Sequence, residues 1–371
     1  MNVPLIWFFK LGQFSHINTE VESLLRKRFP ECEVRCIDVL EDILKKKRSL
    51  YLLASLHATL RYGKHILKER RPPRDFILRL PWVWKNVQKQ AAALSADTRT
   101  WFTFQTQSLF DAGSKAVPHF VYTDHTYLAN RRYPVPAPMF PASQEWKCLE
   151  ASLYQQAAIV FVTSNFCVAS LTQDYGLNKA SVVCIFSGCN VRPSEEPPAR
   201  EAHTILFVGL EWERKGGPEL VEAFRQVKKE IPGARLLVAG CRPSLGIDGM
   251  EELGKLPLDE VRRLYMQATL FCLPSIREPS ATVLMEAAAF GLPVISTDVG
   301  GTSDRVVHGE TGWLVPPRDT DALTCALLEA LRHPEEARRR GAQGKKRYFA
   351  HFRWDEVGVK METMIRQQLH S

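Results

Sequence analysis

Long apolar runs are missing from this sequence, since none reaches the roughly 20 residues that a membrane-spanning helix needs. The first residues, MNVPLIWFFKLG, lack the basic region and the small-residue cleavage site of a secretory signal peptide. Low-complexity tracts and short-period repeats are also absent. We therefore expect a folded cytoplasmic protein whose chain does not cross a membrane.

Cysteine patterns of known purpose are lacking as well. The nine cysteines are an odd number without the spacing of a disulfide framework, which is typical of a reducing compartment. Cys32/Cys36 and Cys184/Cys189 have no His or Cys partners at zinc-site spacing, so we interpret them as buried thiols.

Two phosphate-binding motifs are absent too. The sequence contains neither GxGxxG nor GxxxxGK[ST], which counts against a dinucleotide-dependent dehydrogenase and against a P-loop enzyme. The chain does have 371 residues with 45% hydrophobic content, which is enough for two domains of ordinary size with real cores.

Positive charge is unevenly distributed. Residues 1–198 hold 25 basic and 17 acidic side chains, which accounts for the whole net charge of +8, because residues 199–371 hold 24 of each. Residues 41–90 alone hold 13 basic and 4 acidic side chains. This excess predicts an acidic partner for the first half, such as an anionic membrane surface or an anionic acceptor.

The segment 41–71 has leucines at helical spacing, mixed with Lys45–Arg48 and Arg70-Arg71. Two interpretations of this amphipathic segment stay open. Either it lies on an anionic bilayer as a peripheral membrane element, or its apolar stripe packs into its own domain while its lysines are solvated.

Strand and helix signals alternate along the chain, which predicts an α/β fold with mostly parallel sheets. Strands are expected at residues 3–9, 33–39, 101–105, 119–123, 159–163, 182–186, 203–208, 235–239, 251–254, 269–273, 294–297 and 312–315. Helices are expected at 17–28, 41–71, 145–157, 218–229, 259–267, 321–332 and 335–350. The proline-rich RPSEEPPA at 192–199 is typical of a linker between two domains.

Asp124 and His125 come directly after the expected strand at 119–123, and a proline-rich loop follows them at 133–141. Side chains just past the carboxyl end of a parallel strand face the crevice where open α/β sheets bind ligands. The alternative is that Asp124 caps local backbone and His125 lies on the surface. Both interpretations stay open.

A basic glycine turn follows the expected strand at 203–208. It runs from Gly209 to Pro218 and carries Arg214 and Lys215 just before a helix. Two full positive charges beside a helix N-terminus make a site for phosphate. Basic residues in such a turn are also commonly just solvated, so the turn alone decides nothing.

The stretch 274–301, PSIREPSATVLMEAAAFGLPVISTDVGG, carries two acids eight positions apart. Glu278 lies in a loop, and Glu286 lies in a helix that we expect to begin at Pro279–Thr282 and to offer free amides to a phosphate. An acid at each end of such a cradle suits a sugar–diphosphate–nucleoside, which has hydroxyls at both ends. The alternative is a surface Glu278 and a Glu286 that pairs locally.

Four blocks in the second half resemble family 4 of the glycosyltransferases, which are retaining nucleotide-sugar enzymes with the two-domain GT-B fold. They are FVGLEWERKGGPELVEAF at 207–224, PGARLLVAG at 232–240, LPSIREPSATVLMEAAAFGLPVISTDVGG at 273–301 and HGETGWLVPPRDTDAL at 308–323. The spacing Glu-x7-Glu at 278 and 286 is the family's signature. The first half resembles the family only in patches, at 163–176, at 185–191 and at Gly12.

The resemblance implies two Rossmann-like domains that face each other across a cleft. Residues 1–193 would form the acceptor-side domain, 194–199 the linker, 200–350 the donor-binding domain, and 351–371 a C-terminal helix that packs back on the first domain. The implied reaction moves a sugar, a hexose in our interpretation, from a nucleotide-diphosphate sugar to a hydroxyl of a glycan, glycolipid or lipid-linked precursor. No cofactor, metal or nucleic acid is implied.

The resemblance also implies roles for single residues. Arg214 and Lys215 would neutralise the departing diphosphate, Glu278 would hold the donor sugar, and Glu286 would hold the ribose. The other implied donor-side positions are Gly12, Gly209, Pro279, Ser280, Ala281 and Thr282, with Asp124 or His125 beside the sugar. Pro279-Ser280-Ala281 stands where the family usually has Gly-Phe-Gly.

Two other functional classes stay open. One is a GT-B enzyme of the nucleotide-sugar 2-epimerase type, which would convert the donor without any acceptor. The other is a non-catalytic relative that binds or scaffolds. The joint presence of Arg214, Lys215, Glu278 and Glu286 argues against a decayed site.

Overall fold

The computed structural model describes residues 3–12, 16–69, 72–136, 139–193 and 198–370. Its residues form two compact units. The first comprises Met1–Arg131, Ala137–Ile185 and Gly358–Ser371, and the second comprises Arg132–Pro136 and Phe186–Val357. Residues 194–197, most of the predicted linker, lie outside the described residues, and the predicted domain boundaries stay a prediction.

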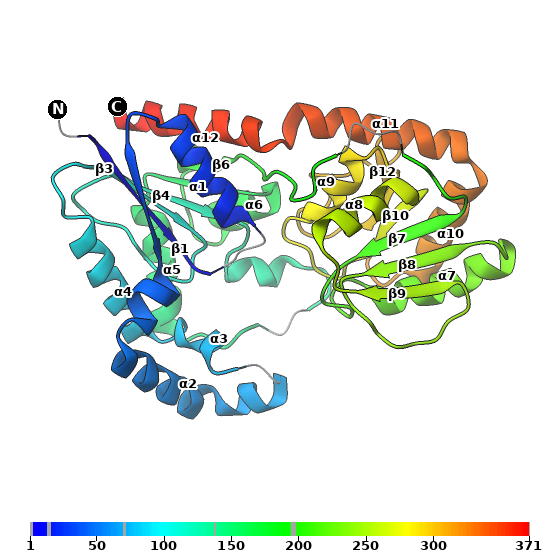
Figure 1. Ribbon diagram of the computed structural model, residues 1–371. Helices are drawn as coiled ribbons and strands as arrows, with labels where there is room; N and C mark the ends of the chain where they lie inside the picture. Colours follow the sequence, from blue (N-terminus) through cyan, green and yellow to red (C-terminus); the bar gives the residue numbers. More distant parts are fainter. Residues whose placement is uncertain (1–2, 13–15, 70–71, 137–138, 194–197, 371) are drawn as a thin grey trace. The chain divides into compact units, whose positions relative to one another are not determined.

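The first unit is built on a parallel sheet of six strands in the order β2-β1-β3-β4-β5-β6 (Figure 1). The strands are β1 (Leu5–Lys10), β2 (Glu33–Asp38), β3 (Thr100–Thr106), β4 (His119–Thr123), β5 (Ile159–Val162) and β6 (Val182–Cys184). The helical elements up to residue 185 are α1 (Ile17–Arg28), η1 (Val39–Lys45), α2 (Arg48–Glu69), α3 (Arg74–Ile77), α4 (Pro81–Leu94), η2 (Leu128–Arg132), α5 (Gln144–Gln156), α6 (Asn165–Gln173) and η3 (Lys179–Ser181).

The second unit has a parallel sheet of six strands in the order β12-β11-β10-β7-β8-β9. The strands are β7 (Thr204–Val208), β8 (Arg235–Ala239), β9 (Met250–Gly254), β10 (Leu270–Leu273), β11 (Val294–Thr297) and β12 (Gly312–Val315). The helices are α7 (Gly217–Glu230), α8 (Leu258–Gln267), α9 (Thr282–Ala289), α10 (Thr320–Arg332) and α11 (Pro334–His351), followed by α12 (Trp354–His370), which continues into the first unit.

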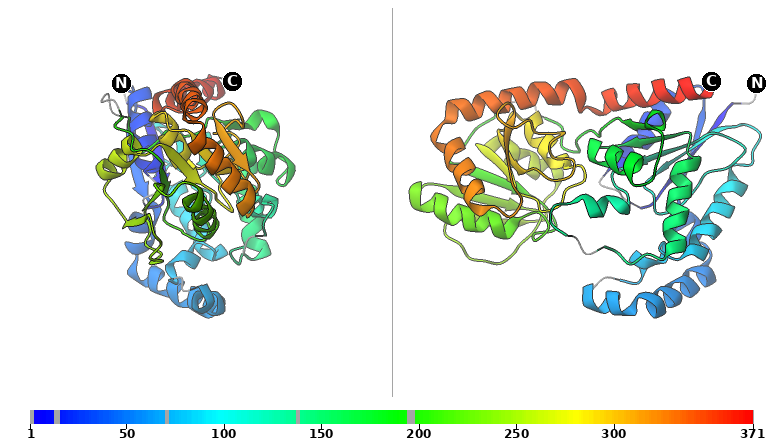
Figure 2. Two further views of the ribbon diagram at one scale, coloured as in Figure 1. Left: turned by 90° about the vertical axis from the view of Figure 1, so that its right-hand side faces the viewer. Right: turned by 180° about the vertical axis from the view of Figure 1, so that it is seen from behind.

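Helices cover both faces of the second sheet, α7 and α10 on one side and α8 and α9 on the other (Figures 1 and 2). The central strands are therefore buried on both faces, and this is why they are continuous apolar runs rather than alternating ones. Every residue of β10 is buried. The predicted α/β class with mostly parallel sheets is confirmed.

The predicted strands and helices are present, with ends shifted by a few residues. Two predictions are corrected. The segment expected as one helix at 41–71 is two, since η1 ends at Lys45 and α2 begins at Arg48. The Asp38 carboxylate caps the start of η1 by accepting from the amides of Leu40 (2.9 Å) and Glu41 (3.2 Å). In addition, α4 occupies residues where no helix was predicted.

The last part of α12 packs within the first unit. Arg366 pairs with Glu31 at 2.9 Å, donates a hydrogen bond to the Arg28 carbonyl at 3.0 Å, and lies over the ring of Phe29 at 4.7 Å.

None of the helices in the described part of the chain combines the length and apolar character that a membrane span requires.

Candidate functional site

The strand order of the second sheet reverses between β7 and β10. From β7 the chain proceeds outward to β8 and β9, and from β10 it proceeds in the opposite direction to β11 and β12. Open α/β sheets bind ligands outside the carboxyl ends of the strands at such a reversal. The loops at this point, 209–216 and 274–281, contain most of the predicted donor-site residues.

These two loops are joined by backbone contacts. Gly216 has φ 73°, and a Cβ built on it would lie 1.9 Å from the carbonyl oxygen of Pro274, so only glycine fits this position. The amide of Ile276 donates to the Arg214 carbonyl at 2.9 Å, and the Arg214 guanidinium donates to the Arg277 carbonyl at 2.9 Å. These contacts hold the two loops directly against each other.

A buried ion pair lies between the two loops. Lys215 Nζ donates to Glu278 Oε2, and Arg214 Nη1 is 3.7 Å from the same oxygen. The Ser275 hydroxyl donates to that oxygen as well, at 3.3 Å. Glu278 is only 4% exposed. The structure thus brings Glu278 together with the adjacent Arg214 and Lys215, which lie 64 and 63 positions earlier in the sequence.

The charge of Glu278 is maintained by its cationic partners. Burial alone would raise the pKa of this carboxyl, but the positive charges of Lys215 and Arg214 outweigh burial and leave the pKa below its ordinary value. The Glu278 carboxylate is consequently ionised at neutral pH and remains a hydrogen-bond acceptor.

Of the residues Pro279–Thr282 that were expected to begin the helix after Glu278, only Thr282 is helical. Glu278 Oε1 accepts the amide of Ala281 at 3.0 Å, and Ala281 has φ 51°, a left-handed conformation that cannot belong to the helix. The first amides of α9, from Thr282 onward, have no acceptor inside the helix.

Arg305 was missed by the sequence analysis. It is 4% exposed and donates to the Ser280 carbonyl at 3.1 Å and to the Ser280 hydroxyl at 3.2 Å. Its guanidinium lies over the rings of Phe186 and Phe352, at 4.9 and 4.8 Å. Arg305 fixes the turn before α9, but no motif in the sequence pointed to it.

Glu286 lies within α9 and is 3% exposed. Its Oε1 accepts the amides of Asn190 (3.1 Å) and Val191 (3.4 Å), and its Oε2 accepts the hydroxyl of Tyr265 (2.9 Å). Tyr265 is a second partner that the sequence analysis missed.

The other predicted site residues belong to the first unit, where they follow the carboxyl ends of strands. Gly12 follows β1 with φ 53°, and its amide donates to Asp38 Oδ2 at 3.0 Å. Asp124 and His125 follow β4 and are half-buried, and the His125 ring is stacked on Phe166 with centroids 6.3 Å apart. Their predicted roles stay a prediction.

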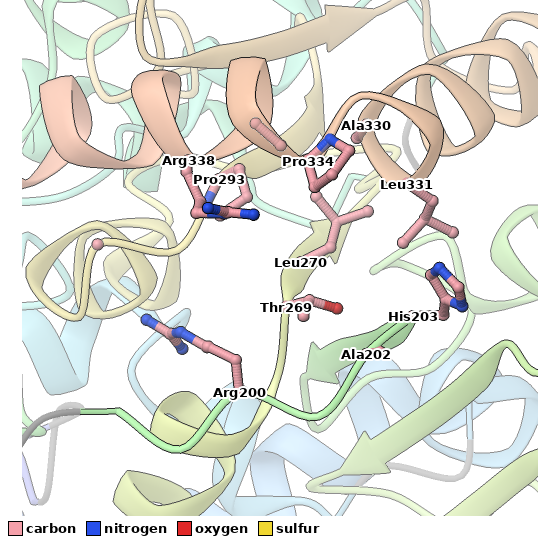
Figure 3. A pocket seen from close by; sticks show the side chains of 12 residues that line it. Arg200, Ala202, His203, Thr269, Leu270, Pro293, Ala330, Leu331, Pro334 and Arg338 are labelled. Carbon is pink, nitrogen blue, oxygen red and sulfur yellow. The ribbon is translucent and has the colours of Figure 1, made fainter.

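A cavity of about 410 Å³ lies at the amino ends of β7, β10 and β11, whereas the candidate site lies past the carboxyl ends of the strands (Figure 3). Arg200 and His203 border it from the segment before β7, and Leu270 lines it from β10. The Arg200 guanidinium donates to the carbonyls of Ala268 (2.9 Å) and Phe290 (2.6 Å). Arg200 therefore holds the ends of α8 and α9, away from the candidate site.

Within the described ranges, no group of three or more His, Cys, Asp or Glu side chains is placed to hold a metal ion. The expectation of a metal-independent site stays a prediction.

Residues 193–347 match the family model of glycosyl transferases group 1. Relatives match over part of the chain. Glycogen synthase of Mycobacterium tuberculosis is 27% identical over 232 residues, which cover 58% of this chain and 56% of that protein. Alpha-maltose-1-phosphate synthase of Mycolicibacterium smegmatis is 33% identical over 187 residues, which cover 44% and 47%. The chain spans about half the length of the curated relatives it matches.

Solved structures share the fold over nearly the whole chain. Sucrose-phosphate synthase from Thermosynechococcus elongatus has a TM-score of 0.72 at 20% identity and covers 98% of both chains. HepE from Anabaena, solved in complex with UDP and glucose, has a TM-score of 0.66 at 13% identity, with 98% of this chain and 100% of that chain covered. These likenesses confirm the predicted GT-B fold. The match to glycosyl transferases group 1 is limited to residues 193–347, so the transferase activity of the whole chain and membership of family 4 stay predictions.

Proposed function

We propose that this chain moves a sugar, a hexose, from a nucleoside-diphosphate sugar to an acceptor hydroxyl, with retention of configuration and without a metal ion. The observation that carries the proposal is the buried Lys215–Glu278 pair, held beside Arg214 at the strand-order reversal of a group 1 domain. Two cations next to the start of α9 suit a diphosphate. The carboxylates of Glu278 and Glu286 suit the hydroxyls of a sugar and a ribose at the two ends of that diphosphate.

In the proposed reaction, the bond between C1 of the donor sugar and the diphosphate oxygen breaks while the acceptor oxygen bonds to C1 on the same face. Negative charge grows on the leaving diphosphate. Lys215, Arg214 and the first amides of α9 stabilise that charge, because they are already in place before the reaction. The acceptor proton passes to the leaving diphosphate, so a separate base is not required.

The remaining residues act as binding groups in this proposal. Glu278 accepts hydrogen bonds from the sugar hydroxyls, and Glu286 accepts them from the ribose. Gly12 allows the loop after β1 to approach the donor, and Asp124 or His125 lies beside the sugar. The acceptor that we propose is a glycan, a glycolipid or a lipid-linked precursor.

The nucleotide is left to experiment, because the similar proteins differ. HepE was solved with UDP, whereas a relative from Mycobacterium tuberculosis, 29% identical over 184 residues, is named as a GDP-mannose-dependent mannosyltransferase. A thermal-shift screen of UDP-, GDP- and ADP-sugars would identify the donor. Trials of acceptors, with the product anomer assigned by NMR, would then test retention.

The decisive variants are Lys215→Met and Glu286→Gln. We expect the correct nucleotide sugar to raise the melting temperature of the wild type by several degrees, since a ligand that binds only the folded state stabilises it. Lys215→Met removes the charge beside the diphosphate and should abolish this shift. Glu286→Gln keeps the size and the contact with Asn190 but weakens the ribose contact, so it should reduce the shift strongly.

A matched control is available in the same unit. Lys255→Met removes an exposed lysine after β9 and should keep most of the shift. The proposal fails if no nucleotide sugar stabilises the wild type, or if Lys215→Met and Glu286→Gln both respond as the wild type does. Conversion of the donor sugar without acceptor would favour the 2-epimerase class instead.

A further inference from the structure

Helix α2 presents a stripe of leucines to solvent. The stripe consists of Leu52, Leu53, Leu56, Leu60 and Leu67, with exposed fractions of 68, 59, 58, 77 and 81%. Successive residues of a helix are about 100° apart, which places these five side chains within one arc. The interpretation that the apolar stripe packs into its own domain is therefore wrong for these leucines.

The opposite face of α2 is the one that packs against the first unit. Ala54, Ala58 and Tyr62 are 0, 0 and 4% exposed, and the Tyr62 hydroxyl donates to the Arg79 carbonyl at 3.1 Å. In Figure 1, α2 lies at the margin of the first unit, beside α3. The helix thus has two apolar faces, and one of them faces outward. Exposed apolar patches of this extent mark interaction sites.

The charge around the stripe has one sign. From Lys45 to Lys68 the sequence contains seven Lys or Arg residues and no Asp or Glu. Arg61, Lys64 and Lys68 are exposed and follow one edge of the stripe, while residues 45–48 are exposed at its start. A leucine face bordered by lysines and arginines is complementary to a surface that is apolar inside and anionic outside.

We propose that α2 docks on an anionic lipid bilayer, with its leucines among the upper acyl chains and its basic residues at the headgroups. A helix of this composition binds in the interface by apolar burial together with attraction to anionic lipids. A second copy of the chain is the other occupant that the stripe could accommodate. Between Lys45 and Lys68, however, two copies would bring lysines and arginines together without any acid to pair them, so lipid is favoured.

The test measures vesicle binding by the full chain. Vesicles of phosphatidylcholine alone are compared with vesicles in which part of it is replaced by phosphatidylglycerol, in a sedimentation assay. We expect binding to the anionic vesicles and much weaker binding to the neutral ones. The double variant Leu56→Gln/Leu60→Gln should lower the partition coefficient about tenfold or more. Lys64→Gln/Lys68→Gln should lower it by about fivefold for each lysine.

The variants should fold normally, because their side chains are already exposed, and circular dichroism checks this. Leu258→Gln is the matched control: it removes an exposed leucine of α8 in the second unit and should bind vesicles as the wild type does. Equal binding to neutral and anionic vesicles, or full binding by Leu56→Gln/Leu60→Gln, would overturn the proposal. So would self-association that this variant abolishes, combined with no vesicle binding, since a second copy would then be the occupant.

This inference does not depend on the sugar-transfer proposal. Vesicle binding is measured without a nucleotide sugar, and the leucine variants should keep the donor-dependent thermal shift. Failure of one experiment therefore leaves the other interpretable.

Discussion

In the proposed function, the charge pair of Lys215 and Glu278 serves binding rather than stability. A buried ion pair gains little over apolar side chains of the same volume, because removing both charges from water is costly. Here the pair keeps an ionised carboxylate and an ammonium group fixed next to each other at the edge of a sheet. A site prepared in this way needs little rearrangement when a charged ligand arrives.

Glu150 is a buried acid of a different kind. It lies in α5 at 2% exposure and accepts hydrogen bonds from the Tyr127 amide (3.1 Å) and the Tyr175 hydroxyl (2.5 Å). Burial raises the pKa of Glu150 to about 7, against an ordinary value of 4.5, although its hydrogen bonds and the Arg79 charge oppose the shift. Between these two pH values the folded protein binds more protons than the unfolded chain, so stability falls as pH rises.

We therefore expect Glu150→Gln to flatten the pH dependence of folding. From pH 4.5 to 7 the free energy of unfolding of the wild type should fall, relative to this variant, by about 3 kcal/mol. Urea unfolding followed by tryptophan fluorescence at several pH values measures the difference. Glu145→Gln, which changes an exposed acid of the same helix, should retain the wild-type profile. Parallel profiles for wild type and Glu150→Gln would contradict the prediction.

At the scale of elements, the candidate site depends on the close approach of two loops. Gly216 is the N-cap of α7, and its lack of a side chain is what lets the loop after β7 touch the carbonyl of Pro274. Any larger residue would push the loops apart and would separate Lys215 from Glu278.

Gly216→Ala should therefore destabilise the second unit by about 3 kcal/mol, from left-handed strain together with the displaced loop. It should also abolish the donor-dependent thermal shift. Gly233→Ala is the control, because a Cβ there meets no heavy atom within 4 Å, and its effect should stay within about 0.5 kcal/mol. Thermal unfolding with and without nucleotide sugar measures both effects, and similar behaviour of the two variants would refute the role assigned to Gly216.

Sequence patterns predicted elements well where the chain is buried on both faces. β10 is an uninterrupted apolar run, and so is β7 after Thr204. Helices pack on both faces of this parallel sheet, so side chains on both faces of these strands are apolar rather than alternating with polar ones. No helix was predicted at α4, although Val83, Val87 and Ala91 have helical spacing. Pro279–Ala281 were expected to belong to the first turn of α9, but Ala281 is left-handed and its amide donates to the Glu278 side chain, so these residues precede the helix.

The predicted site was recoverable only in part, for a similar reason. Arg214, Lys215 and Glu278 carry charges beside glycine or a helix start, which is a local signal. Arg305 and Tyr265 act through contacts with residues 25 and 21 positions away, and nothing local distinguishes them from other core residues. Tertiary contacts of this kind are visible only in the folded chain.

At the scale of the whole molecule, α12 connects the two units. It begins in the second unit at Trp354, and its residues from Gly358 onward belong to the first. A Cβ on Gly358 would lie 2.6 Å from the Leu24 side chain, so α1 and α12 are in close contact there. Arg366 then ties the last turns to the segment around Phe29.

Arg366→Ala should loosen the end of α12. The variant loses the ion pair with Glu31 and the hydrogen bond to the Arg28 carbonyl, so amide hydrogen exchange in residues 362–370 should become clearly faster. Hydrogen-exchange mass spectrometry measures this directly. Arg225→Ala, which removes an exposed i,i+3 pair on α7, should leave exchange in α12 unchanged. Unaltered exchange in Arg366→Ala would show that apolar packing alone holds the segment.

The division of the chain between the units also bears on how it can be cut into fragments. Met361 and Ile365 are 1 and 0% exposed, and both lie in the part of α12 that belongs to the first unit. A fragment that starts at Phe186 and runs to the end would carry these side chains without the partner that covers them, and would tend to aggregate. A soluble fragment of the second unit should instead stop near Val357, and a first-unit fragment would need residues 358–371 supplied as a separate peptide.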